Sequence, residues 1–267
     1  MVPDMVPPSY SLSGRVALVT GAGSPDGIGF ATARLLGELG AKVAVAATTD
    51  RVHDRAAELR ATGCDAFAVV ADLTDEDQVT GAIDEVAGAL GEPTILVNNA
   101  GMSSVRSPGM ATESGALGDI PPALWRASMS RNLDTAFLTT RAALPGMIAA
   151  GWGRVVMVTS VTGAVMAMST EASYAAAKAA MVGLARSAAI DYAAAGVTVN
   201  CVAPGWIATA SQTEDEARQG GSTPVGRSAV PIEVAAVIAF LCTPGAAYVT
   251  GQTVVVDGGN SIAEERA

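Results

Sequence analysis

The sequence RVALVTGAGSPDGIG, residues 15–29, joins a short apolar run to a glycine-rich turn. The run from Arg15 to Thr20 predicts a buried strand, and the pattern from Ile28 to Gly40 predicts a helix. Glycines between a strand and a helix let the backbone approach a pyrophosphate closely, and the free N–H groups at the helix start favour an anion. The stretch therefore predicts a nucleotide-binding unit. The alternative is an ordinary glycine-rich turn.

Apolar runs and helical patterns continue to alternate along the chain. Further strands are predicted at residues 42–47, 66–71, 94–97, 154–159, 197–202 and 253–256. Helices are predicted at residues 51–61, 124–150 and 232–242, with one starting near 74–77 and one running from Tyr174 to about 195. This order predicts one α/β domain of the doubly wound Rossmann type, with a seven-stranded, largely parallel sheet and helices on both faces. Residues 1–13, which contain three prolines, are expected to form a loose N-terminal leader before a domain at 14–267.

Composition excludes several classes of function. Half of the 267 residues are hydrophobic and the formal net charge is −10, which argues against nucleic acid or an anionic membrane as the main partner. The three cysteines lie far apart and His53 is the only histidine, so no metal site is expected. The odd cysteine count and the lack of a secretion signal predict a cytoplasmic protein with reduced thiols.

Tyr174 and Lys178 are four residues apart in an alanine-rich stretch that predicts a helix. That spacing places both side chains on one helix face. An ammonium beside a phenol lowers the phenol's pKa and makes it a usable general acid or base. The alternative is a buried tyrosine and a surface lysine that share a helix by accident. Ser160 follows the predicted strand 154–159, and Asn132 is a polar amide inside the long predicted helix, where it could also bend the helix or face solvent.

The end of the second predicted strand indicates the choice of coenzyme. A free ribose diol is usually bound by an acidic side chain at this point, but here Ala47 is followed by Thr48 and Thr49. The missing carboxylate favours NADP(H) over NAD(H). Arg51 either reaches the 2′-phosphate or is solvated. Asp72, after the third strand, could meet the adenine amino group or cap the following helix, and the two interpretations are compatible.

Three irregular segments complete the expected site. Asn98-Asn99-Ala100-Gly101 can hold backbone against a ribose, although such residues also make good turns. Residues 102–122 are long for a connection in a compact domain, so they are interpreted as a flap over the active site. Residues 209–226 are polar and are expected to be irregular.

Together these motifs resemble the short-chain dehydrogenase/reductase family, from about Ser11 to Gly259. The resemblance rests on Thr20-Gly21 through Gly27-Ile28-Gly29, Asp72-Leu73, Asn98 to Gly101, Asn132, Ser160, Tyr174 with Lys178, Pro204-Gly205 and Asp257-Gly258-Gly259. Within the family the sequence is most similar to 3-oxoacyl-carrier-protein reductases, through residues 46–49, Gly226-Arg227 and residues 231–235.

The resemblance implies an NAD(P)H-dependent oxidoreductase that interconverts a ketone, such as a 3-oxoacyl thioester, and a secondary alcohol. It implies that Tyr174 is the general acid or base, that Ser160 binds the substrate oxygen, and that Lys178 binds the nicotinamide ribose. Asn132 would hold a water in a proton relay to Lys178. A catalytically silent nucleotide-binding regulator of the same fold is the alternative.

The resemblance also implies coenzyme contacts and an assembly. The expected contacts are Gly21, Ser24, Asp26, Gly27, Ile28, Gly29, Thr48, Thr49, Asp72, Leu73, Asn99, Ala100, Gly101, Tyr174, Lys178, Pro204, Gly205, Ile207 and Thr209. The expected assembly is a homotetramer or homodimer. The sequence departs from the family pattern in a glycine turn that is two residues longer, most simply Pro25 and Asp26, and in the longer segment 102–122.

Overall fold

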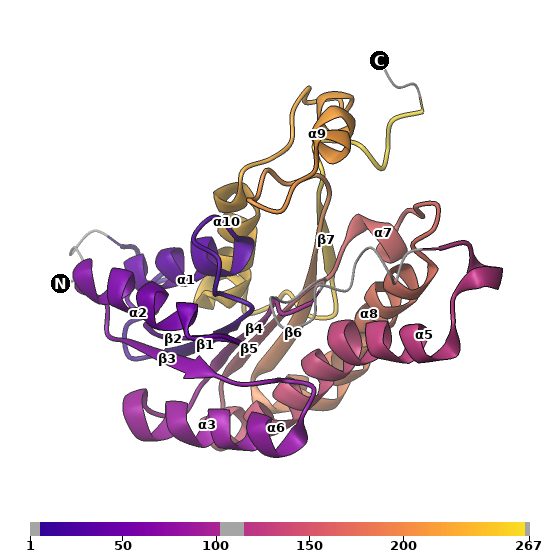
Figure 1. Cartoon of the computed structure of the whole chain (residues 1–267). Coiled ribbons are helices and arrows are strands. Elements are labelled where there is room, and N and C mark those ends of the chain that lie inside the picture. Colours follow the sequence, from indigo (N-terminus) through magenta and orange to yellow (C-terminus); the bar gives the residue numbers. More distant parts are fainter. Residues whose placement is uncertain (1–5, 102–114, 265–267) are drawn as a thin grey trace.

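The computed structural model describes residues 6–101 and 115–264. A seven-stranded sheet lies at its centre, with strands in the order β3-β2-β1-β4-β5-β6-β7 and every neighbouring pair parallel (Figure 1). The strands are β1 (Val16–Thr20), β2 (Lys42–Ala47), β3 (Ala66–Val70), β4 (Ile95–Asn98), β5 (Gly153–Val158), β6 (Val197–Pro204) and β7 (Thr253–Val256). The predicted fold class is confirmed.

Helices cover both faces of the sheet. They are α1 (Ile28–Glu38), α2 (Arg51–Ala61), α3 (Glu76–Leu90), α5 (Pro122–Met129), α6 (Thr135–Ala149), α7 (Val161–Ala164), α8 (Ala172–Tyr192), α9 (Glu214–Gly221) and α10 (Pro231–Cys242). Helices α1, α2 and α10 share one apolar cluster with the sheet, while α3, α6 and α8 share another. Within the described part of the chain, no helix combines the length and the apolar character needed to span a membrane.

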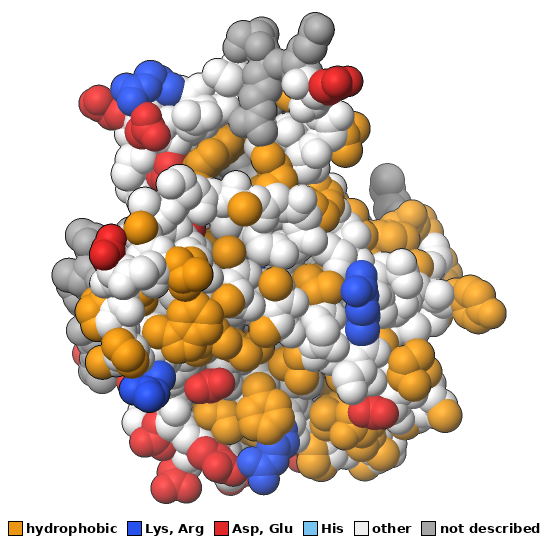
Figure 2. All heavy atoms as spheres, turned by 90° about the vertical axis from the view of Figure 1, so that its right-hand side faces the viewer, with side chains coloured by type: hydrophobic (Ala, Val, Ile, Leu, Met, Phe, Trp, Pro, Cys, Tyr) orange, Lys and Arg blue, Asp and Glu red, His pale blue; other side chains and the backbone are white. Residues whose placement is uncertain are grey.

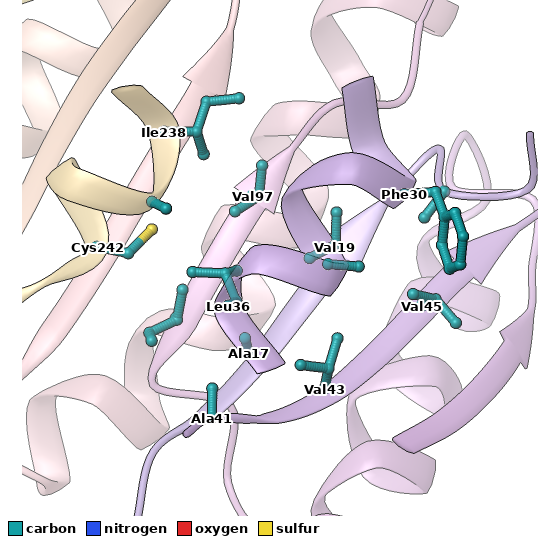
Figure 3. Packing of buried hydrophobic residues seen from close by; sticks show 14 of the residues in the cluster. Ala17, Val19, Phe30, Leu36, Ala41, Val43, Val45, Val97, Ile238 and Cys242 are labelled. Carbon is teal, nitrogen blue, oxygen red and sulfur yellow. The ribbon is translucent and has the colours of Figure 1, made fainter. Parts of the chain in front are cut away.

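The alternation of side chains along β1 explains the two layers. Ala17 and Val19 point into the first cluster, whereas Val16 and Leu18 point into the second. Figure 3 shows the first cluster, where Leu36 of α1 lies over Ala17 and Val19. Because both faces are covered, the strands are almost continuously apolar, as is typical of parallel sheets.

The order of the strands reverses between β1 and β4, which are neighbours although two strands separate them in sequence. Doubly wound sheets bind ligands outside the carboxyl ends of their strands at such a point. The glycine-rich turn follows β1 here, and Asn99 follows β4. The topology therefore brings the predicted coenzyme motifs to one edge of the sheet.

The structure corrects three expectations about local structure: the loose leader, the unbroken helix at 124–150 and the irregular segment 209–226. The loose leader is wrong from Ser9 onward, because Leu12 is fully buried and its amide donates to the Leu39 carbonyl oxygen at 2.8 Å. The Gly245 amide also donates to the Ser9 carbonyl oxygen at 2.7 Å. The long helix containing Asn132 is interrupted by a wide π-helical turn, Ser130–Asp134, between α5 and α6.

Residues 209–226 are not wholly irregular, because they contain α9. Thr213 and Glu216 form a capping box at its start: the Thr213 hydroxyl accepts from the Glu216 amide at 3.2 Å, and the Glu216 carboxylate accepts from the Thr213 amide at 2.7 Å. This signal was present in the sequence as a threonine followed three residues later by a glutamate. Of the expected flap, residues 102–114 lie outside the described residues.

Candidate active site

The turn after β1 allows very close backbone approach. Gly21 has a φ of +65°, and a Cβ there would lie 2.9 Å from both the Ala100 Cα and the Asn99 Nδ2. A Cβ on Gly29 would lie 2.6 Å from the same Asn99 nitrogen. Only glycine fits at either position. The N-cap residue of α1 is Gly27, which has no side chain to cap the helix and so leaves the first helical amides open to an anion on its side.

Asn99 and Thr20 hold this turn against the end of β4. The Asn99 side-chain amide donates to the Thr20 and Gly21 carbonyl oxygens, each at 3.1 Å. The Thr20 hydroxyl accepts from the Asn99 and Ala100 amides at 3.0 Å and donates to the Val97 carbonyl oxygen at 3.2 Å. The side chain of Asn99 therefore shapes the backbone around the expected coenzyme site. The clamp made by Thr20 was not predicted from the sequence.

No acidic residue occupies the end of β2, where the chain continues as Ala47, Thr48 and Thr49. Thr48 and Thr49 are half-buried, and the Arg51 Nε donates to the Thr49 hydroxyl at 3.4 Å. The hydroxyls and the guanidinium thus lie together just beyond the strand. In the glycine turn, Ser24 is half-buried and Asp26 is exposed.

Asp72 does not cap α3, so that alternative is wrong. The cap is Asp75, whose carboxylate accepts from the Gln78 amide at 3.0 Å. The Asp72 carboxylate instead accepts from the Thr74 amide at 3.0 Å and from the Thr74 hydroxyl at 2.7 Å. Leu73 was predicted as a coenzyme contact, but its side chain is buried in the hydrophobic core, so only its backbone could face a ligand.

The structure brings the four predicted catalytic residues together at the same edge of the sheet. Tyr174 and Lys178 share one face of α8, with the Lys178 ammonium 5.7 Å from the centre of the Tyr174 ring. Ser160 lies just after β5, close enough to the Tyr174 phenol to affect its pKa, and its hydroxyl accepts from the Thr162 amide at 3.1 Å.

Asn132 reaches the same place from the wide turn. A Cβ on Gly101 would lie 2.9 Å from the Asn132 Oδ1 and 3.3 Å from the Lys178 Nζ, so both side chains lie against this glycine. Asn132 is 1% exposed and Lys178 is 3% exposed. The buried ammonium also donates to the Val158 carbonyl oxygen at 3.0 Å.

The electrostatics of the pair differ from the prediction. Burial raises the pKa of Tyr174 to about 12, the hydrogen bond from Ser160 opposes this rise, and the carboxylates of Glu171 and Glu216 add to it. Burial also lowers the pKa of Lys178 to about 8. The net pKa of Tyr174 is therefore raised and not lowered, because desolvation of the phenol is the largest effect on it.

The two carboxylates near Tyr174 were missed in the sequence. Glu171 lies three residues before the tyrosine, while Glu216 belongs to the capping box of α9, a helix that was not predicted. Tertiary packing alone brings Glu216 near the phenol. The Gly115 amide donates to the Thr170 carbonyl oxygen at 2.8 Å, which ties the chain before α5 to the segment before α8.

The end of β6 completes the edge. Pro204 is the last residue of β6, and the Gly205 amide donates to the Val256 carbonyl oxygen at 2.9 Å. Ile207 forms an isolated bridge with Ala229, and the Thr209 hydroxyl lies 3.0 Å from the Ser211 hydroxyl. Ile207 and Ala229 close the base of the segment that contains α9.

Among the described residues, no group of three histidine, cysteine, aspartate or glutamate side chains could hold a metal ion.

Comparison with known proteins gives consistent matches over nearly the whole chain. The family model described as Enoyl-(Acyl carrier protein) reductase matches residues 21–261. A cis-4-hydroxycyclohexanecarboxylate dehydrogenase of Sinomonas cyclohexanicum is 42% identical over 249 residues, covering 92% of this chain and 96% of that protein. A 3-oxoacyl-[acyl-carrier-protein] reductase of Pseudomonas aeruginosa is 39% identical over 254 residues, covering 93% and 98%. The crystal structure of a gluconate 5-dehydrogenase from Burkholderia cenocepacia, in complex with NADP and tartrate, has a TM-score of 0.86 at 33% identity and covers 96% of this chain and 98% of that one.

Proposed function

The chain belongs to the short-chain dehydrogenase/reductase family, and from that premise we propose that it interconverts a ketone and a secondary alcohol with NADP(H). The observation that carries the proposal is the convergence of Tyr174, Ser160, Lys178 and Asn132 beside the glycine turn. A 3-oxoacyl thioester is the first substrate to test, because one relative is named as a 3-oxoacyl-[acyl-carrier-protein] reductase.

Tyr174 is the proton donor in the direction of carbonyl reduction. Its raised pKa keeps the phenol protonated near neutral pH, so a proton is available when an alkoxide develops on the substrate. The Ser160 hydroxyl lies near the phenol, where it can bind the same substrate oxygen. When bound, the nicotinamide coenzyme supplies or accepts the hydride.

Lys178 and Asn132 supply the proton path behind the phenol. The ammonium carries protons that can replace the one given up by Tyr174, and its pKa of about 8 lets it exchange them near physiological pH. The Asn132 amide oxygen lies against the same Gly101 as the ammonium, where it can hold a water for the relay. Both side chains are buried and held by hydrogen bonds: Lys178 donates to the Val158 carbonyl oxygen and the Asn132 side-chain amide donates to the Ser128 carbonyl oxygen, each at 3.0 Å.

The residues present fit a dinucleotide coenzyme. Gly21 and Gly29 leave a cradle that a Cβ would fill, and the start of α1 is free of a side-chain cap. Thr48, Thr49 and Arg51 would bind a 2′-phosphate and offer no carboxylate to a ribose diol, which supports NADP(H) over NAD(H). The B. cenocepacia structure was solved with NADP.

We further propose that the protein is cytoplasmic and forms a homotetramer or homodimer. Figure 2 shows hydrophobic side chains gathered on the face that carries α5, α7 and α8, with few charged groups among them. Phe137 and Ile148 on α6 and Ile190 on α8 are exposed. Light scattering of the purified protein would measure its oligomeric state, and a monomer would refute this part of the proposal.

A catalytically silent regulator of the same fold is the competing function. Such a protein is expected to have lost at least one of the four convergent residues, and none is missing here. The test is an initial-rate assay with NADPH and NADH against ketones, 3-oxoacyl thioesters and secondary alcohols. No turnover with any of these would favour the regulator.

Tyr174→Phe tests the role of the phenol. The variant should lose about 10²- to 10⁴-fold in kcat while its Kd for NADPH stays within a factor of about two, because only the proton route is removed. Tyr192→Phe, which removes a hydroxyl at the other end of α8, is the matched control and should keep full activity. Normal turnover by Tyr174→Phe would refute the assignment.

A further inference from the structure

The wide turn Ser130–Asp134 sets the direction of Asn132. It connects α5 and α6 without a break, and Asn132 is its central residue. An α-helix advances about 100° per residue, so the extra residue in a π turn rotates the following face by about that angle. If the turn relaxed to regular α geometry, Asn132 would swing by a comparable angle relative to α6. Its amide oxygen would then no longer lie against Gly101 beside Lys178.

Thr135, the residue directly after the turn, compensates for the altered hydrogen bonding. Its amide donates to the Ser130 carbonyl oxygen, five residues back. In an α-helix the same amide would donate to the carbonyl of Arg131, four residues back. The Thr135 hydroxyl replaces the missing amide donor, because it donates to the Arg131 carbonyl oxygen at 2.9 Å. Thr135 is 5% exposed, so water has little access to replace this bond.

A second threonine, Thr139, contacts the backbone carbonyl of Thr135. The Thr139 hydroxyl lies 2.6 Å from the Thr135 carbonyl oxygen and 2.6 Å from the Asn98 Oδ1. Asn98 is the last residue of β4 and also donates to the Thr140 hydroxyl at 2.8 Å. The start of α6 is thereby held to the central sheet. With α6 fixed, Asn132 is oriented by the register of the wide turn and by its own side-chain amide, which donates to the Ser128 carbonyl oxygen at 3.0 Å.

We propose that Thr135 is a positioning residue, whose hydroxyl stabilises the wide turn and so aims the Asn132 amide oxygen at Lys178. The inference rests on the proposed function, because it assigns the geometry a role in the proton relay. Thr135 itself does not touch the reacting atoms. Its side chain acts through the backbone of Arg131 and, by way of that backbone, on the neighbouring Asn132.

The test is Thr135→Val, which keeps the side-chain shape and removes the hydroxyl. Thr135→Ser restores a hydroxyl and should rescue the variant. Thr80→Val is the matched control, because the Thr80 hydroxyl makes the same kind of bond, 3.0 Å to the Glu76 carbonyl oxygen, within regular α3. The measurements are kcat, KM and the pH profile of kcat for the full-length protein, with the Kd for NADPH.

Thr135→Val should lower kcat by about 10- to 100-fold and change the pH profile, because the relay is displaced while substrate binding is kept. Thr135→Ser should recover most of kcat, and Thr80→Val should keep it. A kcat for Thr135→Val within twofold of the wild type would overturn the proposal. A loss of stability with unchanged kcat would overturn it too, since that is what a purely structural threonine predicts.

A wild-type protein without turnover would refute the proposed function. The effect of Thr135 on the position of Asn132 can still be tested in that case, by crystallography. In the crystal structure of Thr135→Val, an Asn132 amide oxygen displaced from Gly101 and Lys178 would support the positioning role. An unmoved amide would refute it.

Discussion

The Asn99 side-chain amide donates to the Gly21 carbonyl oxygen at 3.1 Å, so the loop after β4 fixes the turn after β1. Both segments lie where the strand order reverses. A Cβ on Gly29 would collide with the same amide nitrogen, which shows how closely the turn wraps around it. The expected coenzyme cradle is therefore built by two distant parts of the chain.

Asn99→Leu should weaken coenzyme binding through this contact. The change removes the side-chain donor to the Thr20 and Gly21 carbonyl oxygens, which costs about 1–3 kcal/mol. We expect the Kd for NADPH to rise about tenfold and the Tm to fall, measured by titration calorimetry and thermal unfolding. Gln252→Met is the control, because it removes an amide donor from an exposed loop. An unchanged Kd would show that the turn keeps its shape without Asn99.

The architecture could be predicted because its signals are local. The strand before Gly21 is a short apolar run, and the spacing of Tyr174 and Lys178 gives one helix face directly. The relative placement of Ser160 and Asn132 followed from the resemblance to a family, and the structure brings both residues to the same edge. Their chemical roles remain predictions that kinetics must test.

Other features depend on tertiary context. The wide turn at Asn132 changes the helix register by one residue and leaves no mark in the apolar pattern of residues 124–150. The raised pKa of Tyr174 follows from burial by the whole fold and from Glu216 of α9. Leu12 could not be assigned to the core from its neighbours in sequence, since it joins a cluster of residues that are far from it in the chain. Local sequence therefore predicts the scaffold better than the electrostatics of the site.

Thr48→Asp should reverse the preference between coenzymes. A carboxylate just beyond β2 would repel a 2′-phosphate and could accept a hydrogen bond from a ribose diol. We expect the ratio of kcat/KM for NADPH to that for NADH to fall by tenfold or more, because placing like charges together costs several kcal/mol. Thr62→Asp puts the same charge at the far end of α2 and should leave the ratio unchanged. If Thr48→Asp also left it unchanged, the phosphate would be bound elsewhere.

Asp26→Asn should strengthen coenzyme binding. Asp26 is exposed in the lengthened glycine turn, where its charge opposes a bound phosphate. Exposed charge pairs are worth about 0.2–1 kcal/mol, so the Kd for NADPH should fall by about two- to fivefold at low salt. The gain should shrink as salt is added, because salt screens exposed charges. Asp84→Asn on α3 should have no effect, and a weaker affinity for Asp26→Asn would indicate that the carboxylate helps to order the turn.

Lys178→Met should stabilise the protein measured without coenzyme while abolishing turnover. Burial lowers the pKa of Lys178 to about 8, from an ordinary value of 10.5. Between these values the unfolded chain binds a proton that the folded chain has released, so the contribution of Lys178 to the free energy of unfolding rises with pH across this window. Below pH 8 the folded protein carries the full cost of the buried ammonium.

Methionine removes that cost, although it leaves the Val158 carbonyl oxygen without its donor. At pH 7 the variant should therefore be the more stable protein, by about 1–2 kcal/mol, and its advantage should shrink between pH 8 and pH 10.5. The raised pKa of Tyr174 destabilises both proteins above pH 10, where the unfolded phenol ionises first, so to first order it cancels in the comparison. Urea unfolding at pH 7, 8, 9 and 10 measures the difference directly. Two results would contradict this prediction: a variant that is less stable at pH 7, or a stability difference that does not change with pH. Either would mean that burial of the Lys178 ammonium does not destabilise the folded protein, and that its lowered pKa is wrong.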